Sequence, residues 1–417
     1  QRAWCYSPRI LDPGNADVVW IPQVALLRTI DGGRSIHSVG GIHHGDVHDL
    51  WIDPRAPERV IIGNDGGVDL SLDGGKTWFA PPMPWSQFYN VDVDDRLPYH
   101  VGGTVQDEGT AMGPSDSLRA EGIVLGDWQT AGGGEAGDFV FDRAEVGVVY
   151  AGEYGGIMTR WEEGSANERN ISYYPTNPSG HGAEDLRVRF QWTAPLLASR
   201  REPGVIFHGS NILLRSADGG QTWKQVSPDL TRNDKEKQKW SGGPITGDNT
   251  GVEIYDTIFS LAESTHTDGE LWAGTDDGLV HVTRDGGATW TNVTPAGMPE
   301  WATVESIALS RADAGTAWIA VDAHRLDDLR PYVFRTRDAG VSWESAIQGL
   351  PANAYVLAVR EDPEVPGLLY AGTRSGVFLS RDGGDRWEAF KLNLPPAVIS
   401  DLEVKNGDLV VATSGRS

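Results

Sequence analysis

HGDVHDLWIDPRAPERVIIGNDGGVDLSLDGGKTW, residues 44–78, holds one complete copy of the repeat that decides the fold of this chain. It ends in a turn signature, Ser71-Leu-Asp73-Gly-Gly75-Lys-Thr77-Trp78, which we call the Asp-Gly-Gly turn. The signature recurs with small changes at residues 216–223, 283–290, 336–343 and 380–387, and without its tryptophan at 29–35. A signature that returns at a period of roughly 20–50 residues indicates a repeat architecture rather than a few unrelated domains.

The spacing of these turns shows where further repeats lie. Their aspartates are Asp31, Asp73, Asp218, Asp285, Asp338 and Asp382. The long interval between Asp73 and Asp218 is about three periods of roughly 48 residues, so two repeats in it have lost the turn. Residues 88–106 and 138–161 contain the strand-like runs that these two repeats need.

Each repeat is predicted to form four strands. In the first complete copy, strand-like runs at 49–52, 59–63, 68–72 and 78–80 are separated by turn residues. The runs are mostly apolar, as expected for strands covered on both faces by neighbouring sheets. Four antiparallel strands at a period of about 40–50 residues are typical of a propeller blade. The sequence therefore predicts an all-β β-propeller of four-stranded antiparallel blades, with seven blades expected and eight as the alternative.

The predicted seven-bladed propeller covers residues 41–392. Residues 1–40 would form most of a further blade, and residues 393–417 would add two more strands. These ends either combine into a closing eighth blade or belong to a neighbouring propeller, and we expect the second arrangement. Because the chain begins at Gln1 rather than Met, we also expect a processed or trimmed piece.

The composition limits the classes of partner. The net charge of −24 argues against nucleic acid, because a phosphate backbone attracts basic surfaces, and it suits neutral or cationic ligands. No apolar run approaches the roughly 18 residues of a membrane span. Cys5 is the single cysteine, so an internal disulfide is ruled out.

The topology of a four-stranded blade indicates which face carries the function. The Asp-Gly-Gly turn joins the third and fourth strands, so it lies opposite the loop between the second and third. That loop and the segment leading into the first strand share the rim of the central channel, where ligands would bind. Candidate ligand-binding residues on this rim are His44, Asp46, His48, Asn64, Glu153, Gln191, Trp192, Asn211, Arg325 and Arg374. Candidate catalytic carboxylates, which could act in pairs in glycoside hydrolysis, are Asp65, Asp107, Glu135, Asp276 and Asp277.

His44, Asp46 and His48 also have the residue types of a metal site. On an extended strand alternate side chains point the same way, so the three could face one ion. The alternative is that they form hydrogen bonds at the channel entrance. No cofactor is predicted, and a structural divalent metal is left open.

The Asp-Gly-Gly turn resembles the Asp-box (BNR) signature of sialidases, sortilin-type receptors and xyloglucanase-type glycosidases. The whole chain resembles bacterial secreted sortilin-like, glycosyl-hydrolase-like Asp-box proteins, through residues 44–54, 63–67, 274–278 and 360–363. The resemblance implies two tandem propellers and a secreted, periplasmic or cell-surface location. Xyloglucanase-type enzymes use two aspartates across the cleft between their propellers, and Asp65 lies in a comparable glycine-rich loop. The Arg-Ile-Pro signature of sialidases is absent, which disfavours that activity.

Three functions follow from these observations. The first is an extracytoplasmic binding module that recognises a peptide, glycan or partner protein at the polar rim of the channel. The second is a xyloglucanase-like glycoside hydrolase with paired carboxylates. The third is a subunit of a larger assembly that docks through exposed blade edges, with a second propeller as one such partner.

Overall fold

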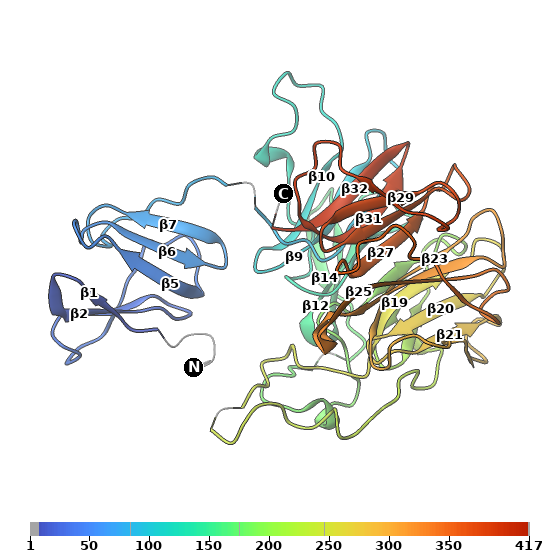
Figure 1. The fold of residues 1–417 in the computed structure, drawn as a ribbon, viewed down its shortest axis with the longest axis horizontal. Coiled ribbons are helices and arrows are strands. Elements are labelled where there is room, and N and C mark those ends of the chain that lie inside the picture. The colour runs from blue at the N-terminus through green and yellow to red at the C-terminus, as the bar shows by residue number, and fades with distance from the viewer. Residues whose placement is uncertain (1–7, 84, 175, 246, 416–417) are drawn as a thin grey trace. The chain divides into compact units, whose positions relative to one another are not determined.

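The computed structural model describes residues 8–83, 85–174, 176–245 and 247–415 (Figure 1). The predictions that concern Gln1 and Cys5 fall outside these residues. The described chain consists of antiparallel sheets and four short 3-10 segments, η1(Leu125–Asp127), η2(Tyr154–Gly156), η3(Ala183–Asp185) and η4(His324–Leu326). This confirms the predicted all-β class. In the described ranges there is no helix with the length and apolar character needed to span a bilayer.

The chain divides into two compact units, Gln1–Trp85 and Ser86–Ser417. The first unit contains a four-stranded sheet and a three-stranded sheet. Their strands are β1(Ile10–Asp12), β2(Asn15–Ile21), β3(Leu27–Thr29) and β4(His37–Ser38), then β5(Val47–Ile52), β6(Val60–Asn64) and β7(Gly67–Ser71). The sheets pack through a core that includes the fully buried Trp20, Leu26 and Ile62.

The second unit repeats the same up-and-down sheet. Its first strands are β8(Asp92–Val93), β11(Phe139–Phe141), β15(Leu196–Ala198), β19(Ile258–Glu263), β23(Thr303–Leu309), β27(Val356–Glu361) and β31(Val398–Lys405). Its second strands are β9(His100–Val105), β12(Val148–Glu153), β16(Ile206–Gly209), β20(Leu271–Thr275), β24(Ala317–Ala323), β28(Leu369–Thr373) and β32(Asp408–Ser414). Its third strands are β10(Gly109–Pro114), β13(Ile157–Glu162), β17(Leu213–Ser216), β21(Val280–Thr283), β25(Asp328–Thr336) and β29(Gly376–Ser380). Its fourth strands are β14(Asn167–Asn170), β18(Lys224–Gln225), β22(Thr291–Asn292), β26(Glu344–Ser345) and β30(Glu388–Phe390).

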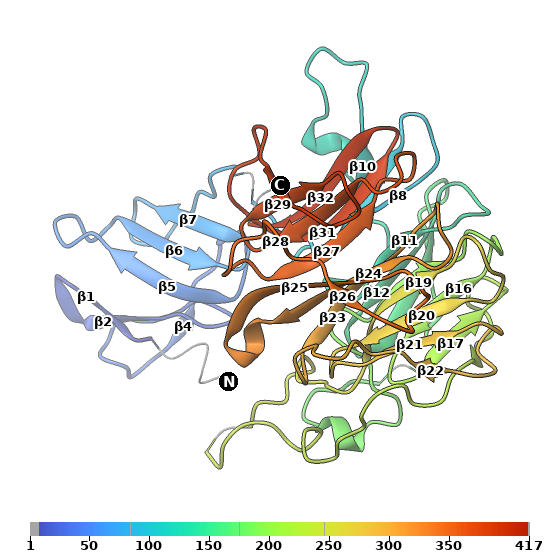
Figure 2. The same ribbon diagram turned by 45° about the vertical axis from the view of Figure 1, so that its right-hand side comes forward.

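The sheets of the second unit follow one another in chain order. Each first strand packs on the next, from β8 and β11 through to β27 and β31, and β31 also contacts β8. Figure 2 shows the sheet of β23–β26 between those of β27–β30 and β19–β22. Phe88 N donates to Thr413 O (3.0 Å) and Gly415 N donates to Ser86 O (2.7 Å), so the start of the unit lies beside its last strand. Sheets packed in this circular order are the arrangement of a β-propeller.

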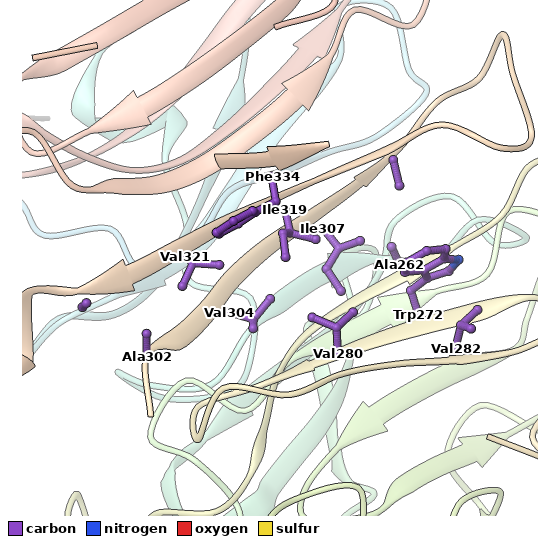
Figure 3. Packing of buried hydrophobic residues seen from close by; sticks show 12 residues of the cluster. Ala262, Trp272, Val280, Val282, Ala302, Val304, Ile307, Ile319, Val321 and Phe334 are labelled. Carbon is purple, nitrogen blue, oxygen red and sulfur yellow. The ribbon is translucent and has the colours of Figure 1, made fainter. Parts of the chain in front are cut away.

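The core of the second unit lies between neighbouring sheets. Val280 and Trp272 of one sheet meet Val304, Ile319 and Val321 of the next, and all five are almost completely buried (Figure 3). Because both faces of such a sheet are covered, its strands are apolar on both sides, which explains the weak alternation in the sequence.

The Asp-Gly-Gly turns are closed by hydrogen bonds to the side chain of their aspartate. At the turn of residues 283–290, Asp285 accepts from Thr289 N (2.8 Å) and Thr289 Oγ1 (2.6 Å), and the hydroxyl of Thr283 donates to it (2.8 Å). These bonds, with that of the Thr289 hydroxyl the strongest, lower the pKa of Asp285 to about 2. Gly287 has φ 97°, and Trp290 Nε1 donates to Val226 O of the preceding sheet (3.0 Å). The turn therefore has a structural role, because its tryptophan holds one sheet to the preceding one.

The predicted domain boundaries differ from the division of the structure. The prediction begins a propeller at residue 41 and ends it at 392, whereas the units divide between Trp85 and Ser86. The sheet β5–β7 therefore belongs to the first unit, and β31 and β32 belong to the second. A sequence period identifies sheets but does not show which sheets close on one another, because closure depends on contacts between distant residues.

Candidate functional site

The first strands of the second unit line a cavity of 530 Å³. At the end where segments lead into the first strands, its wall contains the residues that we call the channel mouth: Tyr89, Trp192, Glu305, His324, Arg325 and Tyr355. Trp192 and Arg325 are predicted ligand-binding residues, and a third, Gln191, also lines the cavity.

A repeated backbone irregularity shapes the cavity wall. The register between first and second strands shifts between Ile258 and Ser260, between Val304 and Ser306, between Val356 and Ala358, and between Ile399 and Asp401. Each shift leaves one extra residue on the first strand, as in a β-bulge, and bulges re-aim side chains. The extra residues Phe259, Glu305, Leu357 and Ser400 all line the cavity.

Glu305 is the one carboxylate among these bulge residues, and sequence reasoning missed it. Within the described residues its side chain forms neither a hydrogen bond nor an ion pair. Burial, with a smaller contribution from the charge of Asp322, raises its pKa to about 8, and Arg325 opposes the shift. The group is therefore protonated near neutral pH and can both donate and accept a hydrogen bond. The sequence feature that could have identified Glu305 is that it is the single charged residue in the run Thr303–Leu309.

Aromatic rings also line the channel mouth. Trp192 stacks on Tyr154 with centroids 5.5 Å apart and planes at 4°, and its Nε1 donates to Tyr89 Oη (2.8 Å). Across the mouth, His324 stacks on Tyr355 at 4.6 Å. Such planar, partly buried rings suit the apolar face of a sugar or a peptide side chain.

Arg374 extends one of these stacks. Its guanidinium lies 5.7 Å from the ring of Tyr355. Arg374 and Arg325 are exposed, so they add positive charge at the solvent side of the mouth.

A second polar cluster joins Glu135 to the loop between β9 and β10. Glu135 accepts from Asp107 N (2.9 Å) and from Gln106 Nε2 (3.1 Å). Burial, together with the adjacent Asp107 carboxylate, raises the pKa of Glu135 to about 7. Two predicted catalytic carboxylates therefore lie together, and one of them titrates near neutral pH, as a general acid or base requires. Glu153, half-buried on the next loop, has its pKa raised by burial.

Three further predicted residues support loops. Asp276 is 2 % exposed and accepts from Thr257 N (2.8 Å) and from Gln191 Nε2 (3.0 Å). Asp277 is fully buried and accepts from Arg232 N (2.5 Å). Burial raises the pKa of Asp276 to about 8 and that of Asp277 to about 6. Asn211 is buried and donates to Asp229 (3.0 Å). Their enclosure favours a structural role.

The remaining predicted residues lie in the first unit. His48 Nε2 pairs with Asp65 Oδ1 at 2.6 Å, and Asn64 Nδ2 donates to His44 O (3.2 Å). Asp46 has φ 52°, so it is not in an extended strand, and the register shifts between Val47 and Asp49. His44, Asp46 and His48 therefore do not alternate along one extended strand, so the argument that they face a single metal ion does not hold. No group of three metal-binding side chains occurs in the described part of the chain.

Replacing Glu305 with Gln is expected to raise thermal stability above about pH 8. Because the pKa of the folded state, about 8, exceeds the ordinary 4.5, the folded chain keeps a proton that the unfolded chain releases. Stability therefore falls as pH rises between these two values, and Gln removes this loss. Melting temperatures near pH 5 and pH 9 would show the difference only at the higher pH. Glu388→Gln at an exposed site is the control, and an equal gain in both variants would contradict the assignment.

The fold and the site together define a repetitive all-β protein with a polar, aromatic-lined central channel. No family model matches the chain, and no curated protein matches it. Among solved structures it is similar to YCF48 from Cyanidioschyzon merolae, with 14% identity, a TM-score of 0.42, and coverage of 89% of this chain and 93% of that one.

Two other solved structures are also similar. The GH74 enzyme from Niastella koreensis has 14% identity, a TM-score of 0.31, and coverage of 98% of this chain and 75% of that chain. A structure of YCF48 bound to D1 peptide has 13% identity, a TM-score of 0.33, and coverage of 98% and 91% respectively. At these scores the similarities carry no argument about function.

Proposed function

We propose that the second unit is a seven-bladed propeller that acts as a binding module, taking a peptide, glycan or partner protein at the channel mouth. The observation that carries this proposal is Glu305, a carboxyl group with no partner among the described residues, on the wall of a 530 Å³ cavity. Glu305 is half-buried and therefore loses part of its hydration without gaining a protein partner among the described residues, which favours a ligand that completes its hydrogen bonds. The extracytoplasmic location and the Asp-box relationship remain predictions.

The chemistry of the mouth favours a ligand with both apolar faces and hydrogen-bonding groups. Trp192 and Tyr355 supply ring surfaces, and Glu305 supplies a carboxyl group that can donate or accept. Sugar rings combine these features, and so do peptides with amide groups beside apolar side chains.

A second function, glycoside hydrolysis, is supported by Glu135 and Asp107. Hydrolysis of a glycosidic bond needs one protonated and one ionised carboxyl group. A pKa of about 7 for Glu135 would keep it protonated over part of the working range, with the carboxyl group of Asp107 beside it as the second member of the pair.

Binding of the intact chain to immobilised glycans and peptides, followed by calorimetry, tests both functions. Trp192→Ala and Glu305→Gln are each expected to weaken binding at least about 10-fold, because each removes a main contact. Trp240→Ala, at a half-exposed tryptophan outside the cavity, and Glu388→Gln are matched controls. Unchanged affinity in both mouth variants would overturn the binding site. Release of reducing ends that Glu135→Gln abolishes would replace the binding function with hydrolysis.

A further inference from the structure

The opposite end of the channel carries a second feature, a set of arginines at one structural position. Arg143, Arg200 and Arg311 each follow the residue that closes the turn after a first strand. The closing bonds are equivalent: Asp142 N to Val148 O, Ser199 N to Val205 O and Ser310 N to Thr316 O, each 2.9 Å. All three arginines line the cavity, together with Thr265 at the same position of the sheet between Arg200 and Arg311. We call these four residues the arginine arc.

The guanidinium groups of the arc differ in their partners. Arg143 is held by Asp92, with distances of 2.6 Å and 2.7 Å to the two carboxylate oxygens, and by Val93 O (2.8 Å). In the described chain, by contrast, the guanidinium groups of Arg200 and Arg311 form neither a hydrogen bond nor an ion pair. Each of these two residues is fixed only through its backbone N–H.

The carboxylates that hold these two backbones already accept hydrogen bonds from the protein. Glu263 accepts from Ser199 Oγ (2.6 Å) and Arg200 N (2.9 Å). Glu361 accepts from Ser310 Oγ (3.2 Å) and Arg311 N (2.9 Å). These bonds hold the two arginine backbones to the next sheet while leaving the side chains free to meet a ligand.

Other charges at this end are also paired. Asp401 accepts from Arg360 (2.6 Å), and Glu403 lies 3.8 Å from Arg360 Nε. Lys405 pairs with Asp95. Among the basic residues at this end, Arg200 and Arg311 are the two without an ion pair in the described chain, and the carboxylates of Glu263 and Glu361 beside their backbones also lack one.

The positive charges of the arc act on one another. Arg200 is exposed to solvent, but the surrounding channel removes part of its hydration and so lowers its pKa; the charges of Arg143 and Arg311 also lower it, while Asp92 and Glu403 oppose the shift. Arg200 is thus close enough to Arg143 and to Arg311 to be repelled by both, in a chain whose net charge is −24. A bound anion would relieve that repulsion, and a guanidinium presents a fork of donors that matches the oxygens of a planar or tetrahedral oxyanion.

We propose that the arginine arc binds an oxyanion, a carboxylate, sulfate or phosphate group, at the end of the channel opposite the channel mouth. Arg200 and Arg311 supply the direct donors, Thr265 adds a hydroxyl group between them, and Arg143 holds the adjoining wall through Asp92. This site is independent of the proposed function, because it shares no residue with the channel mouth.

Titration of the intact chain with sodium sulfate, phosphate or acetate at constant ionic strength tests the proposal. Calorimetry should show one saturable site for at least one anion, and the preferred anion identifies the oxyanion class. Arg200→Gln/Arg311→Gln should weaken that binding at least about 10-fold, since it removes both direct guanidinium donors.

A control variant with the same loss of positive charge distinguishes a specific anion site from non-specific electrostatic attraction. Arg386→Gln/Lys391→Gln removes the same charge from two exposed residues outside the cavity, whose side chains form no hydrogen bond or ion pair within the described chain. It should bind the anion as the wild-type chain does. The proposal is overturned if no anion shows saturable binding, or if the two double variants lose affinity equally. Loss of affinity with unchanged melting temperature in the arc variant excludes unfolding as the cause.

Discussion

Ending the chain after Lys405 is expected to abolish the cooperative unfolding transition of the second unit. The deletion removes β32, which pairs with β31 along its length and accepts the Phe88 N–H at Thr413 O. It also exposes Ile399 and Leu402, which are fully buried in a cluster that includes Leu409 and Val411 of β32. A ring of sheets with one strand missing has two open edges and an uncovered apolar face, so stability is lost from the whole unit rather than from one sheet.

Complementation by a peptide makes this prediction specific. A synthetic peptide of residues 406–415 should restore the transition of the shortened chain, as followed by near-ultraviolet circular dichroism. The same peptide with Ala412→Pro should not, because proline removes a backbone donor from a strand that is paired on both sides. A shortened chain that still unfolds cooperatively at the wild-type temperature would show that closure contributes little.

The closure contacts mark the limit of what the sequence predicts about the fold. Repeated turns such as that of Asp285 and Trp290 are local, so their spacing correctly predicts antiparallel sheets of mostly four strands. The contact between Phe88 and Thr413 joins distant ends of one unit, and no local pattern encodes it. The period of the turns therefore predicts antiparallel sheets of mostly four strands while leaving the boundary between the two units undetermined.

The site shows a similar limit. Blade topology assigns Trp192 and Arg325 to one rim of the channel, and both line the cavity, because such positions depend only on which loops share a face. It does not say which carboxylates meet, and the contact between Glu135 and Asp107 is visible only in the structure. Blade topology also does not reveal Glu305, whose orientation depends on a one-residue bulge. A bulge reverses the alternation of side chains along a strand, and periodicity alone cannot locate it.

Replacing Arg143 with Met is expected to destabilise the second unit by about 3–5 kcal/mol, the usual cost of breaking a buried ion pair from one side. Arg143 and Asp92 are each only 9% exposed at the side chain, and they join β8 to the segment after β11. Chemical unfolding of the wild-type chain and the variant measures the loss. Arg381→Met, which breaks an exposed pair with Glu388, is the control and should cost less than about 1 kcal/mol.

The cause of this cost can be separated from lost packing by a second substitution. Without Arg143, the Asp92 carboxylate keeps the N–H of Phe141 as a donor (2.8 Å) but loses its counter-charge. Asp92→Asn in the Arg143→Met chain removes the uncompensated charge, and the amide oxygen can still accept from Phe141. The double variant should therefore recover about half of the lost free energy, since an unpaired buried charge costs more than an imperfect neutral hydrogen bond. If it recovers none, the cost comes from the packing of the arginine stem against the channel wall, and Arg143 stabilises the ring by its shape rather than by its charge.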